Sequence, residues 1–338
     1  MTQRITIEDV AKAAGVSTAT VSRVLNNSGT VAESTSTKVY AAVQELEYVP
    51  HSGARMLAAS RTQNLGLIMP GISGLYFTDL LRGIEQVAYD NGYHLLLFKT
   101  NGRFTSNSES HLPIGQHNTD GLIIFDDSLS DERILKLYKR NLPLVLLHRL
   151  PPKGTDIPSV TFQNKRGARE LVEYLLQCGH RRIAFLAGPD GNEDSHCREQ
   201  GYEEALAAYQ IEYDPSLIKI GGFLARDSET AVSEWLAEGT KIDAIFAGDD
   251  ESARGALTAL KNAGLRVPDD IAVVGFDDDI LAPYLQPPLT TVRAPIEKAG
   301  RIATQQLIQL IETGVAPDLT LLPTKLIIRD SCGGKKEI

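Results

Sequence analysis

Two runs of acidic residues could do chemistry. Residues 249–251 are Asp-Asp-Glu and follow one short aliphatic segment, while residues 277–279 are Asp-Asp-Asp and follow another. Together the carboxylates could hold a hard cation such as magnesium. Alternatively, Asp250, Glu251 and Asp278 favour the positive N-termini of the next helices. A third interpretation is that Asp249 and Asp277 accept hydrogen bonds from the hydroxyl groups of a ligand.

Other chemical motifs are missing from the sequence. It has no G-x-G-x-x-G after a strand, no phosphate loop ending in Gly-Lys-Ser/Thr, and no G-x-S-x-G elbow. Cys178, Cys197 and Cys332 are odd in number and widely spaced, without the close pairs of metal or redox sites. We therefore expect reduced thiols, no catalytic residue, no metal and no cofactor.

Short aliphatic runs alternate with amphipathic, helix-length segments from residue 62 onward. The runs are Leu65–Met69, His94–Lys99, Gly121–Phe125, Leu144–Leu147, Arg182–Ala187, Asp243–Ala247 and Ile271–Phe276. Such alternation predicts parallel sheets covered by helices. Because the runs fall into two groups, divided near Val160 to Asn164, we expect an α/β core of two doubly wound subdomains. A ligand cleft is expected at the C-terminal ends of the strands.

The first fifty residues predict three short helices. Thr6 is a helix cap followed by an apolar stripe, Gly15 interrupts the stripe, and Ser17 caps a second helix that ends near Leu25. A third helix should begin near Ser34. Periodicity alone leaves open a helical hairpin inside a larger all-helical protein.

The second helix has two distinct faces. Val21, Val24 and Leu25 point inward. The outer face carries Thr18, Ala19, Ser22 and Arg23. A recognition helix presents this part of its surface to base edges.

The segment TIEDVAKAAGVSTATVSRVLNN, residues 6–27, closely resembles the N-terminal signature of the lactose-repressor (LacI/GalR) family of transcriptional regulators. The resemblance implies a small all-α helix-turn-helix head over residues 1–50. Its implied DNA-binding residues are Thr6, Ser17, Thr18, Ala19, Ser22, Arg23 and Asn26. Arg23 is expected to contact either a guanine or a phosphate.

Residues 48–58, YVPHSGARMLA, resemble the hinge helix of the family, although His51 stands where asparagine is usual. The resemblance implies a hinge over residues 51–61 in which Arg55 and Leu57 contact DNA. The leucine is expected to enter the minor groove when two copies pair on the operator. The alternative is a flexible linker with Leu57 buried in the core.

Three further segments resemble family signatures and stand in the expected order: RRIAFLAGP at 181–189, VVGFDD at 273–278 and PLTTV at 288–292. They imply a periplasmic-binding-protein-like core. Its N-subdomain is expected to comprise residues 62–162 plus about 293–323. The C-subdomain is expected to comprise residues 163–292 plus about 324–338.

The resemblance also implies an effector site. Arg198, Asp249 and Asp277 match its polar positions, which suit a polyhydroxylated ligand because each can engage neighbouring hydroxyls. Tyr76, Phe77 and Phe223 match positions that supply flat walls for a sugar ring. Plain core packing is the alternative for these aromatic residues.

Two departures from the family pattern limit the prediction. His148 replaces an aspartate common in sugar-responsive members, which puts a titratable group near the cleft and leaves an acidic or phosphorylated sugar open. If His148 faces the effector, effector affinity should depend on pH. Residues 104–118 form a Ser-rich stretch broken by Pro113 and Gly115, so a helix is expected to be shortened or distorted there.

Charge is distributed unevenly. The net charge is −9, but residues 1–62 hold six basic and five acidic side chains, which leaves −10 for the remainder. An acidic core repels DNA and leaves DNA contact to the head. Because the head is nearly neutral, one copy makes too few contacts, and a homodimer on pseudo-palindromic double-stranded operator DNA is expected.

These features predict a transcriptional repressor controlled by a carbohydrate, with ligand-relieved repression expected and a corepressor left open. The start MTQRITIEDVAK has no signal peptide, and no apolar run approaches the roughly 20 residues that span a bilayer. We therefore expect a cytoplasmic protein without membrane contact. A transporter-linked solute-binding protein would need a signal peptide and no head. A sugar enzyme would need a phosphate loop or an acid-base pair.

Overall fold

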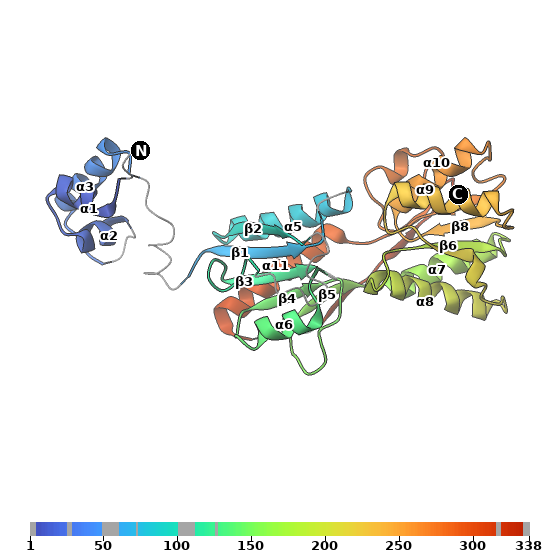
Figure 1. The fold of residues 1–338 in the computed structure, drawn as a ribbon, viewed down its shortest axis with the longest axis horizontal. Coiled ribbons are helices and arrows are strands. Elements are labelled where there is room, and N and C mark those ends of the chain that lie inside the picture. Colours follow the sequence, from blue (N-terminus) through green and yellow to red (C-terminus); the bar gives the residue numbers. More distant parts are fainter. Residues whose placement is uncertain are drawn as a thin grey trace. The chain divides into compact units, whose positions relative to one another are not determined.

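Two units make up the chain in the computed structural model, the head (residues 1–62) and the core (residues 63–338). Figure 1 shows the helices of the head and the two sheets of the core. The structure describes residues 5–25, 29–48, 61–71, 74–100, 112–125, 128–315 and 319–333.

The head consists of three helices, α1 (Ile7–Ala14), α2 (Thr18–Leu25) and α3 (Glu33–Glu45). The Thr6 hydroxyl accepts a hydrogen bond from the Asp9 amide, and the Asp9 carboxylate accepts one from the Thr6 amide at 2.8 Å. This reciprocal cap satisfies amides that the first turn leaves free. The predicted first helix and its cap are therefore confirmed.

The turn between α1 and α2 also follows the prediction. Gly15 ends α1 in the left-handed region with a φ of 69°. The Ser17 hydroxyl accepts a hydrogen bond from the Thr20 amide at 3.2 Å and so caps α2. Val21 and Val24 are buried against α1 and α3, which leaves the opposite face of α2 to solvent.

A parallel six-stranded sheet forms one half of the core, in the order β11-β5-β4-β3-β1-β2. The strands are β1 (Asn64–Met69), β2 (His94–Lys99), β3 (Gly121–Phe125), β4 (Leu144–Leu147), β5 (Ser159–Phe162) and β11 (Thr320–Leu322). Helices α5 (Tyr76–Asp90) and α11 (Ile296–Thr313) cover one face, and α6 (Asp131–Tyr138) covers the other. Both faces of the central strands are buried, so β1, β3 and β4 are apolar nearly throughout rather than alternating.

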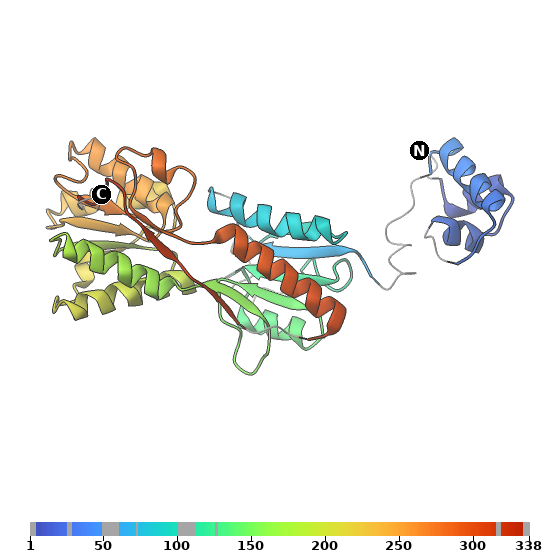
Figure 2. The ribbon, with the colours of Figure 1, turned by 180° about the vertical axis from the view of Figure 1, so that it is seen from behind.

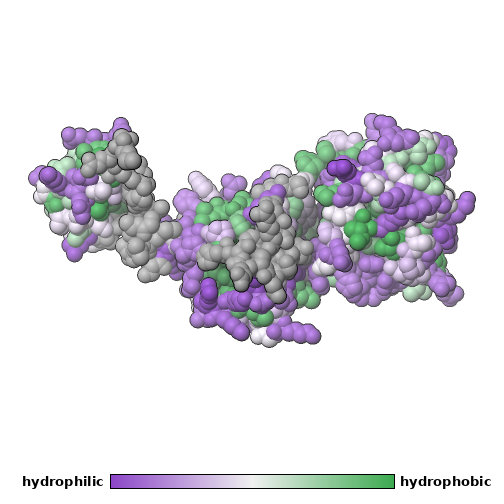
Figure 3. All heavy atoms as spheres, viewed as in Figure 1, coloured by the Kyte–Doolittle hydropathy of each residue, from purple (hydrophilic) through white to green (hydrophobic). Residues whose placement is uncertain are grey.

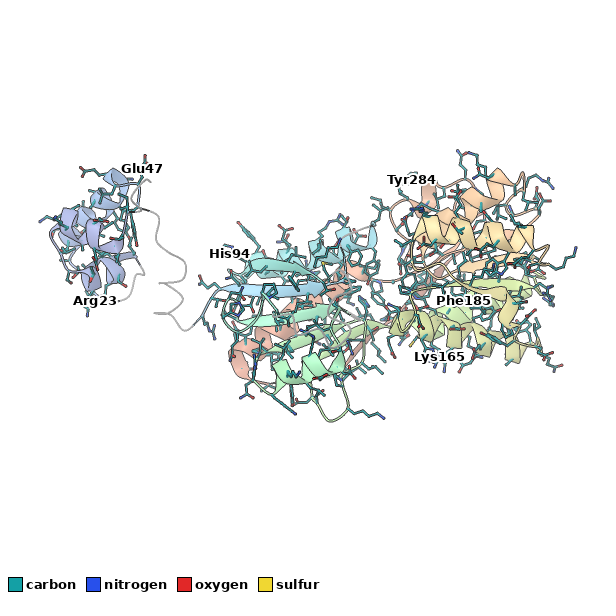
Figure 4. All side chains as sticks on the ribbon, in the orientation of Figure 1. Arg23, Glu47, His94, Lys165, Phe185 and Tyr284 are labelled. Carbon is teal, nitrogen blue, oxygen red and sulfur yellow. The ribbon has the colours of Figure 1, made fainter. Side chains whose placement is uncertain are left out.

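A parallel four-stranded sheet forms the other half, in the order β7-β6-β8-β9. The strands are β6 (Ile183–Ala187), β7 (Ile218–Ile220), β8 (Ala244–Ala247) and β9 (Ala272–Val274). Its covering helices are α7 (Asn164–Gln177), α8 (Glu193–Ala208), α9 (Ala225–Ala237) and α10 (Asp250–Asn262). Phe185, labelled in Figure 4, is fully buried between the sheet and Tyr202 of α8, with ring centroids 5.7 Å apart.

Several segments connect the two sheets. The chain leaves β5 and enters α7 directly, and it returns to the first sheet through β10 (Thr291–Arg293) and α11. After β11, strand β12 (Lys325–Ile327) pairs antiparallel with β10 and carries the chain back, as Figure 2 shows from behind. This exchange is consistent with the predicted subdomain boundaries near 162, 293 and 323, which stay a prediction.

Each of the seven predicted aliphatic runs contains a strand, but the sequence missed β5, β7, β10, β11 and β12. Strand β5 lies in the segment where the core was predicted to divide. Ser159 and Thr161 interrupt its apolar pattern, and the other missed strands are three residues long. Such short runs are indistinguishable from connecting segments by periodicity.

The predicted irregularity at 104–118 is only partly described, because residues 104–111 lie outside the described residues. Residues 112–118 contain no helix and form turns, in which the Asn118 side chain accepts a hydrogen bond from the Gly115 amide at 2.9 Å.

Hydrophilic side chains predominate on the surface seen in Figure 3, with small apolar patches between them. Among the residues described, no helix has both the length and the apolar character that a membrane span requires.

Candidate functional site: the cavity of the core and the outer face of α2

A cavity of about 470 Å³ opens where residues after the strands of both sheets face each other. Its size falls in the range of small-molecule sites. The structure brings all seven predicted effector residues to its wall: Tyr76, Phe77, His148, Arg198, Phe223, Asp249 and Asp277. They come from distant parts of the sequence, so their convergence is a property of the fold.

The wall formed by the first sheet is aromatic. Tyr76 and Phe77 lie in the first turn of α5, with ring centroids 5.5 Å apart, and Phe125 ends β3. His148 follows β4, and its ring centroid lies 5.1 Å from that of Phe125. The Tyr76 hydroxyl lies 2.6 Å from His148 Nε2, so the two side chains orient each other. This wall offers flat apolar surface with a polar edge.

The wall formed by the second sheet is charged, and Arg198 of α8 lies at its centre. Its guanidinium donates to the Asn164 side-chain oxygen at 3.0 Å and to the Gly248 carbonyl at 2.6 Å. It lies 3.5 Å from Asp277 and covers the Phe276 ring at 3.9 Å from the ring centroid. With only 3% of its surface exposed, Arg198 is held in one orientation.

Asp249 has two functions in the structure. It is the N-cap of α10, where one carboxylate oxygen accepts a hydrogen bond from the Ser252 amide at 2.7 Å. The side chain also lines the cavity. Capping of α10, which was not predicted for this residue, and the predicted ligand contact are therefore compatible.

Glycines allow the Phe223 ring to lie against the ends of the central strands. A Cβ at Gly188 would stand 2.4 Å from the ring, and one at Gly248 would stand 3.1 Å from it. No other residue type fits at Gly188 without moving the ring. The ring therefore forms a fixed part of the cavity wall.

Three residues of the cavity wall have a strained backbone. His148, Phe223 and Asp277 have positive φ angles of 61°, 59° and 107°. Non-glycine residues rarely adopt such conformations, which persist where surrounding structure holds them and which cluster at functional sites. These three residues of the wall are all predicted effector contacts, while other positive-φ residues, such as Asn141 and Gln210, lie outside the cavity.

Buried carboxylates dominate the electrostatics of the charged wall. Burial raises the pKa of Asp277 to about 7; the Arg198 charge opposes this rise, and the neighbouring carboxylates of Asp249, Asp194 and Asp279 add to it. Burial also raises the pKa of Asp249, against its hydrogen bonds with Ser252. Burial therefore favours the protonated form of both carboxyl groups, against the charge of Arg198.

Asp194, which lies in the first turn of α8, was not predicted from the sequence as a site residue. Its carboxylate accepts hydrogen bonds from Asn164 at 2.7 Å and from Thr161 at 3.2 Å, and it lies 3.3 Å from His148 Nδ1. Burial alone would raise the pKa of Asp194, but His148, then Arg198 and Thr161, lower it below the ordinary value. In the sequence, an aspartate near the start of a helix is explained by the favourable charge at a helix N-terminus, so nothing marked Asp194 as a site residue.

One interpretation of the acidic runs is wrong. Asp278 does not lie at a helix N-terminus; its carboxylate pairs with Arg293 and Arg329, each at 2.6 Å. Asp279 instead accepts hydrogen bonds from the amides of Leu281 and Ala282, at the start of a short 3₁₀ turn. The neighbouring Asp250 and Glu251 do lie in the first turn of α10, as predicted. The residue that caps the turn after β9 is therefore Asp279, one position later than the predicted Asp278.

The cation interpretation receives no support. Among the described residues, no group of three or more histidine, cysteine, aspartate or glutamate side chains is arranged to hold a metal ion. The oxygens of Asp250 accept hydrogen bonds from the Thr291 hydroxyl and the Asp279 amide, so this carboxylate fixes the loop after β9.

A second cavity, of about 490 Å³, lies beside β5, α7 and α8. Its basic side chains on α7 already have acidic partners: Lys165 pairs with Glu204, Arg166 with Glu170, and Arg169 with Glu173. The first cavity is the better candidate because its predicted contacts converge there.

The predicted DNA-binding residues lie on the first turns and outer face of the head. Thr18, Ala19 and Arg23 are exposed, Ser22 is half-buried, and Arg23 is labelled on the head in Figure 4. The Thr6 and Ser17 hydroxyls act as helix caps. Asn26, Arg55 and Leu57 lie outside the described residues.

The raised pKa of Asp277 predicts a pH dependence of stability. Below about pH 4 this carboxyl is protonated in the folded and unfolded chain alike. Between about pH 4 and 7 it ionises in the unfolded chain but keeps its proton in the folded one, so its stabilising contribution is lost as pH rises. Asp277→Asn should remove this loss.

Denaturant unfolding of both ligand-free proteins at several pH values between 4.5 and 7.5, roughly the range in which the two states differ, measures the effect. Asp269→Asn is the matched control, because Asp269 is exposed and pairs with Arg266 on the surface. An identical pH slope in wild type and Asp277→Asn would contradict the prediction.

Known protein families match both units. Residues 6–51 match the model of bacterial regulatory proteins of the lacI family, and residues 172–332 match that of the periplasmic binding protein-like domain. A ribose operon repressor of Halalkalibacterium halodurans is 36% identical over 330 residues, covering 97% of each chain.

Solved structures agree in fold. A lac repressor dimer bound to operator and the anti-inducer ONPF has a TM-score of 0.81 at 29% identity, covering 98% of this chain and 99% of that chain. A complex of the transcriptional regulator CelR with cellobiose has a TM-score of 0.69 at 31% identity, covering 97% of this chain and 100% of that chain.

The fold and the site define a two-subdomain ligand-binding core joined to a helix-turn-helix head. The chain belongs to the lacI family of bacterial regulatory proteins. It is a DNA-binding transcriptional regulator, and its family consists of regulators rather than enzymes.

Proposed function

We propose that this regulator is a cytoplasmic homodimeric repressor whose affinity for a pseudo-palindromic operator is controlled by a carbohydrate bound in the cavity of the core. The convergence of Arg198, Asp249 and Asp277 opposite an aromatic wall carries the carbohydrate part of the proposal. The sugar-bound and operator-bound relatives support both parts.

The two walls suit a sugar in complementary ways. The C–H face of a sugar ring packs on flat aromatic surface, which Tyr76, Phe77 and Phe223 provide. The hydroxyls of the ring donate to Asp249 and Asp277 and accept from Arg198, because charged groups make the stronger hydrogen bonds.

The head supplies DNA recognition through the exposed face of α2. Thr18, Ala19 and Arg23 read the major groove, while Ser22, Thr6, Ser17 and Asn26 position the head on the backbone. Arg55 and Leu57 act in the hinge, residues 51–61, where Leu57 enters the minor groove of the paired operator.

Ligand binding relieves repression in this proposal. A ligand held by both walls favours the conformation in which the walls approach each other, and it shifts operator affinity by its differential affinity for the two states. The cavity residues come from both sheets. The six-stranded sheet, whose strand β1 follows the hinge in the sequence, therefore moves relative to the four-stranded sheet when ligand binds.

Leu57→Ala tests the DNA part of the proposal. We expect the variant to bind operator selected from a random DNA pool about 10-fold to 100-fold more weakly than wild type, because minor-groove insertion and bending are lost. Gel-shift titration measures operator affinity, and a thermal-shift titration with the bound sugar should show unchanged effector affinity. Unchanged operator affinity would refute the assigned role of the hinge.

A further inference from the structure

Acidic side chains outnumber basic ones on the wall of the cavity. The wall contains six carboxyl groups against three lysine or arginine side chains, besides His148. The carboxylates belong to Asp194, Asp249, Asp250, Glu251, Asp277 and Asp279, and the cations are Lys99, Arg198 and Arg254. A ligand entering this cavity therefore meets a negative electrostatic potential.

Existing pairs account for part of that charge. Arg254 pairs with Glu251 and, at 2.5 Å, with Asp279. Asp250 has both oxygens bound by protein donors and faces the loop after β9. Glu251, Asp279 and Asp250 are therefore already paired with protein groups, and they stabilise the structure around the cavity.

Asp249 and Asp277 are left with Arg198, which also lies 4.0 Å from Asp194. The guanidinium lies 3.5 Å from Asp277 and is otherwise engaged with Asn164 and the Gly248 carbonyl. Asp249 is bound by the Ser252 amide through one oxygen only. Both side chains are more than nine-tenths buried. In the wall formed by the second sheet, one cation thus faces two buried carboxyl groups, where charge imbalance is costly. Lys99 lies on the other wall, at the end of β2.

A separate observation points to a ligand at the same place. His148 lines the cavity, and its buried Nδ1 has Asp194 at 3.3 Å as its one charged neighbour but makes no hydrogen bond of good geometry among the described residues. Buried polar atoms are normally satisfied, so a polar ligand is expected to complete the contacts of His148.

We propose that the effector is an amino sugar, whose protonated amine lies between the carboxylates of Asp249 and Asp277, and that the cavity rejects uronic acids and sugar phosphates. This inference rests on the proposed function, because it assigns the charge of the carbohydrate that binds at that site. A ligand amine supplies the missing positive charge, whereas a carboxylate or phosphate adds to the excess of negative charge. The aromatic wall accepts the ring as for any sugar.

Calorimetric titration of the full-length protein with four matched sugars tests the proposal: a parent hexose, its 2-amino-2-deoxy derivative, its uronate and its 6-phosphate, each in the gluco, galacto and manno series. In the series that binds, the amino sugar should bind at least about 10-fold more tightly than the parent. The uronate and the phosphate should bind at least about 10-fold more weakly, as expected for charge pairs in a desolvated site.

Two variants locate the effect. Asp249→Asn and Asp277→Asn each keep a polar side chain of the same shape but remove one charge, so each should reduce the preference for the amino sugar by about 10-fold. Asp269→Asn makes the same change in net charge at an exposed surface pair and should leave the preference unchanged.

The outcomes separate the two proposals. Equal or tighter binding of the parent, the uronate or the phosphate would overturn the amino-sugar assignment and leave a carbohydrate effector standing. Failure of all these sugars to bind would overturn the carbohydrate effector itself.

Discussion

Replacing Arg198 with methionine is expected to lower effector affinity by about 100-fold, because the ligand loses a fixed, charged hydrogen-bond donor. The same change leaves Asp194, Asp277 and the Gly248 carbonyl without their cation, so the free energy of unfolding should fall by about 3 to 5 kcal/mol. Calorimetric titration and denaturant unfolding measure the two effects. The DNA-binding surface of α2 is untouched.

The regulatory consequence is specific. Arg198→Met should bind selected operator DNA like the wild type but should no longer be released by sugar. Arg226→Met is the matched control, because Arg226 is exposed on α9 and lies outside the cavity. Wild-type sugar affinity in Arg198→Met would refute the assigned role of this residue in the cavity.

Gly201→Val should also abolish effector binding, by a different route. A Cβ at Gly201 would stand 2.2 Å from the Lys165 carbonyl oxygen and 2.9 Å from the Arg169 amide nitrogen, both of which are backbone atoms of α7. The two helices must separate to admit a side chain, at a cost of about 2 to 3 kcal/mol in the free energy of unfolding. Because α8 carries Arg198 and α7 carries Asn164, the separation also disturbs their 3.0 Å hydrogen bond.

Denaturant unfolding and calorimetric titration test this variant as well. Glu203→Ala changes an exposed residue on the same helix and should leave both stability and sugar affinity within experimental error. If Gly201→Val were as stable as wild type, α7 and α8 would not be in the close contact described.

Much of the fold could be predicted from hydrophobic patterning. Runs of four or more apolar residues, such as those that form β3 and β4, are unambiguous because both faces of a parallel sheet are buried. Strand β7 (Ile218–Ile220) could not be predicted, since it has three residues, one of which is Lys219. Its existence depends on pairing with β6, which no local pattern encodes.

The candidate site was predictable where a residue stands inside a recognisable motif. Asp277 was identified in this way, whereas Arg198, three residues before Gly201, was matched to a family position outside the quoted motifs. The fold brings the two side chains within 3.5 Å of each other. Asp194 was missed because its position at a helix start has a sufficient local explanation. Its contacts with His148 and Thr161 arise only when α8 meets the ends of β4 and β5.

The position of His148 refines the prediction made for it. It faces the cavity, as expected for a departure that alters ligand preference, but its ring is also bracketed by Tyr76 and Asp194. A substitution of His148 therefore affects contacts with both walls at once. The sequence alone does not show these contacts, because they depend on the fold.

The most direct test of the account is the operator affinity of the full-length protein measured with and without a sugar that binds in the cavity, using DNA selected from a random pool. The account predicts that saturating sugar weakens operator binding of the wild type at least about 10-fold, within the usual range of allosteric coupling, and leaves Arg198→Met unaffected. Operator affinity that stays the same at saturating sugar would contradict it.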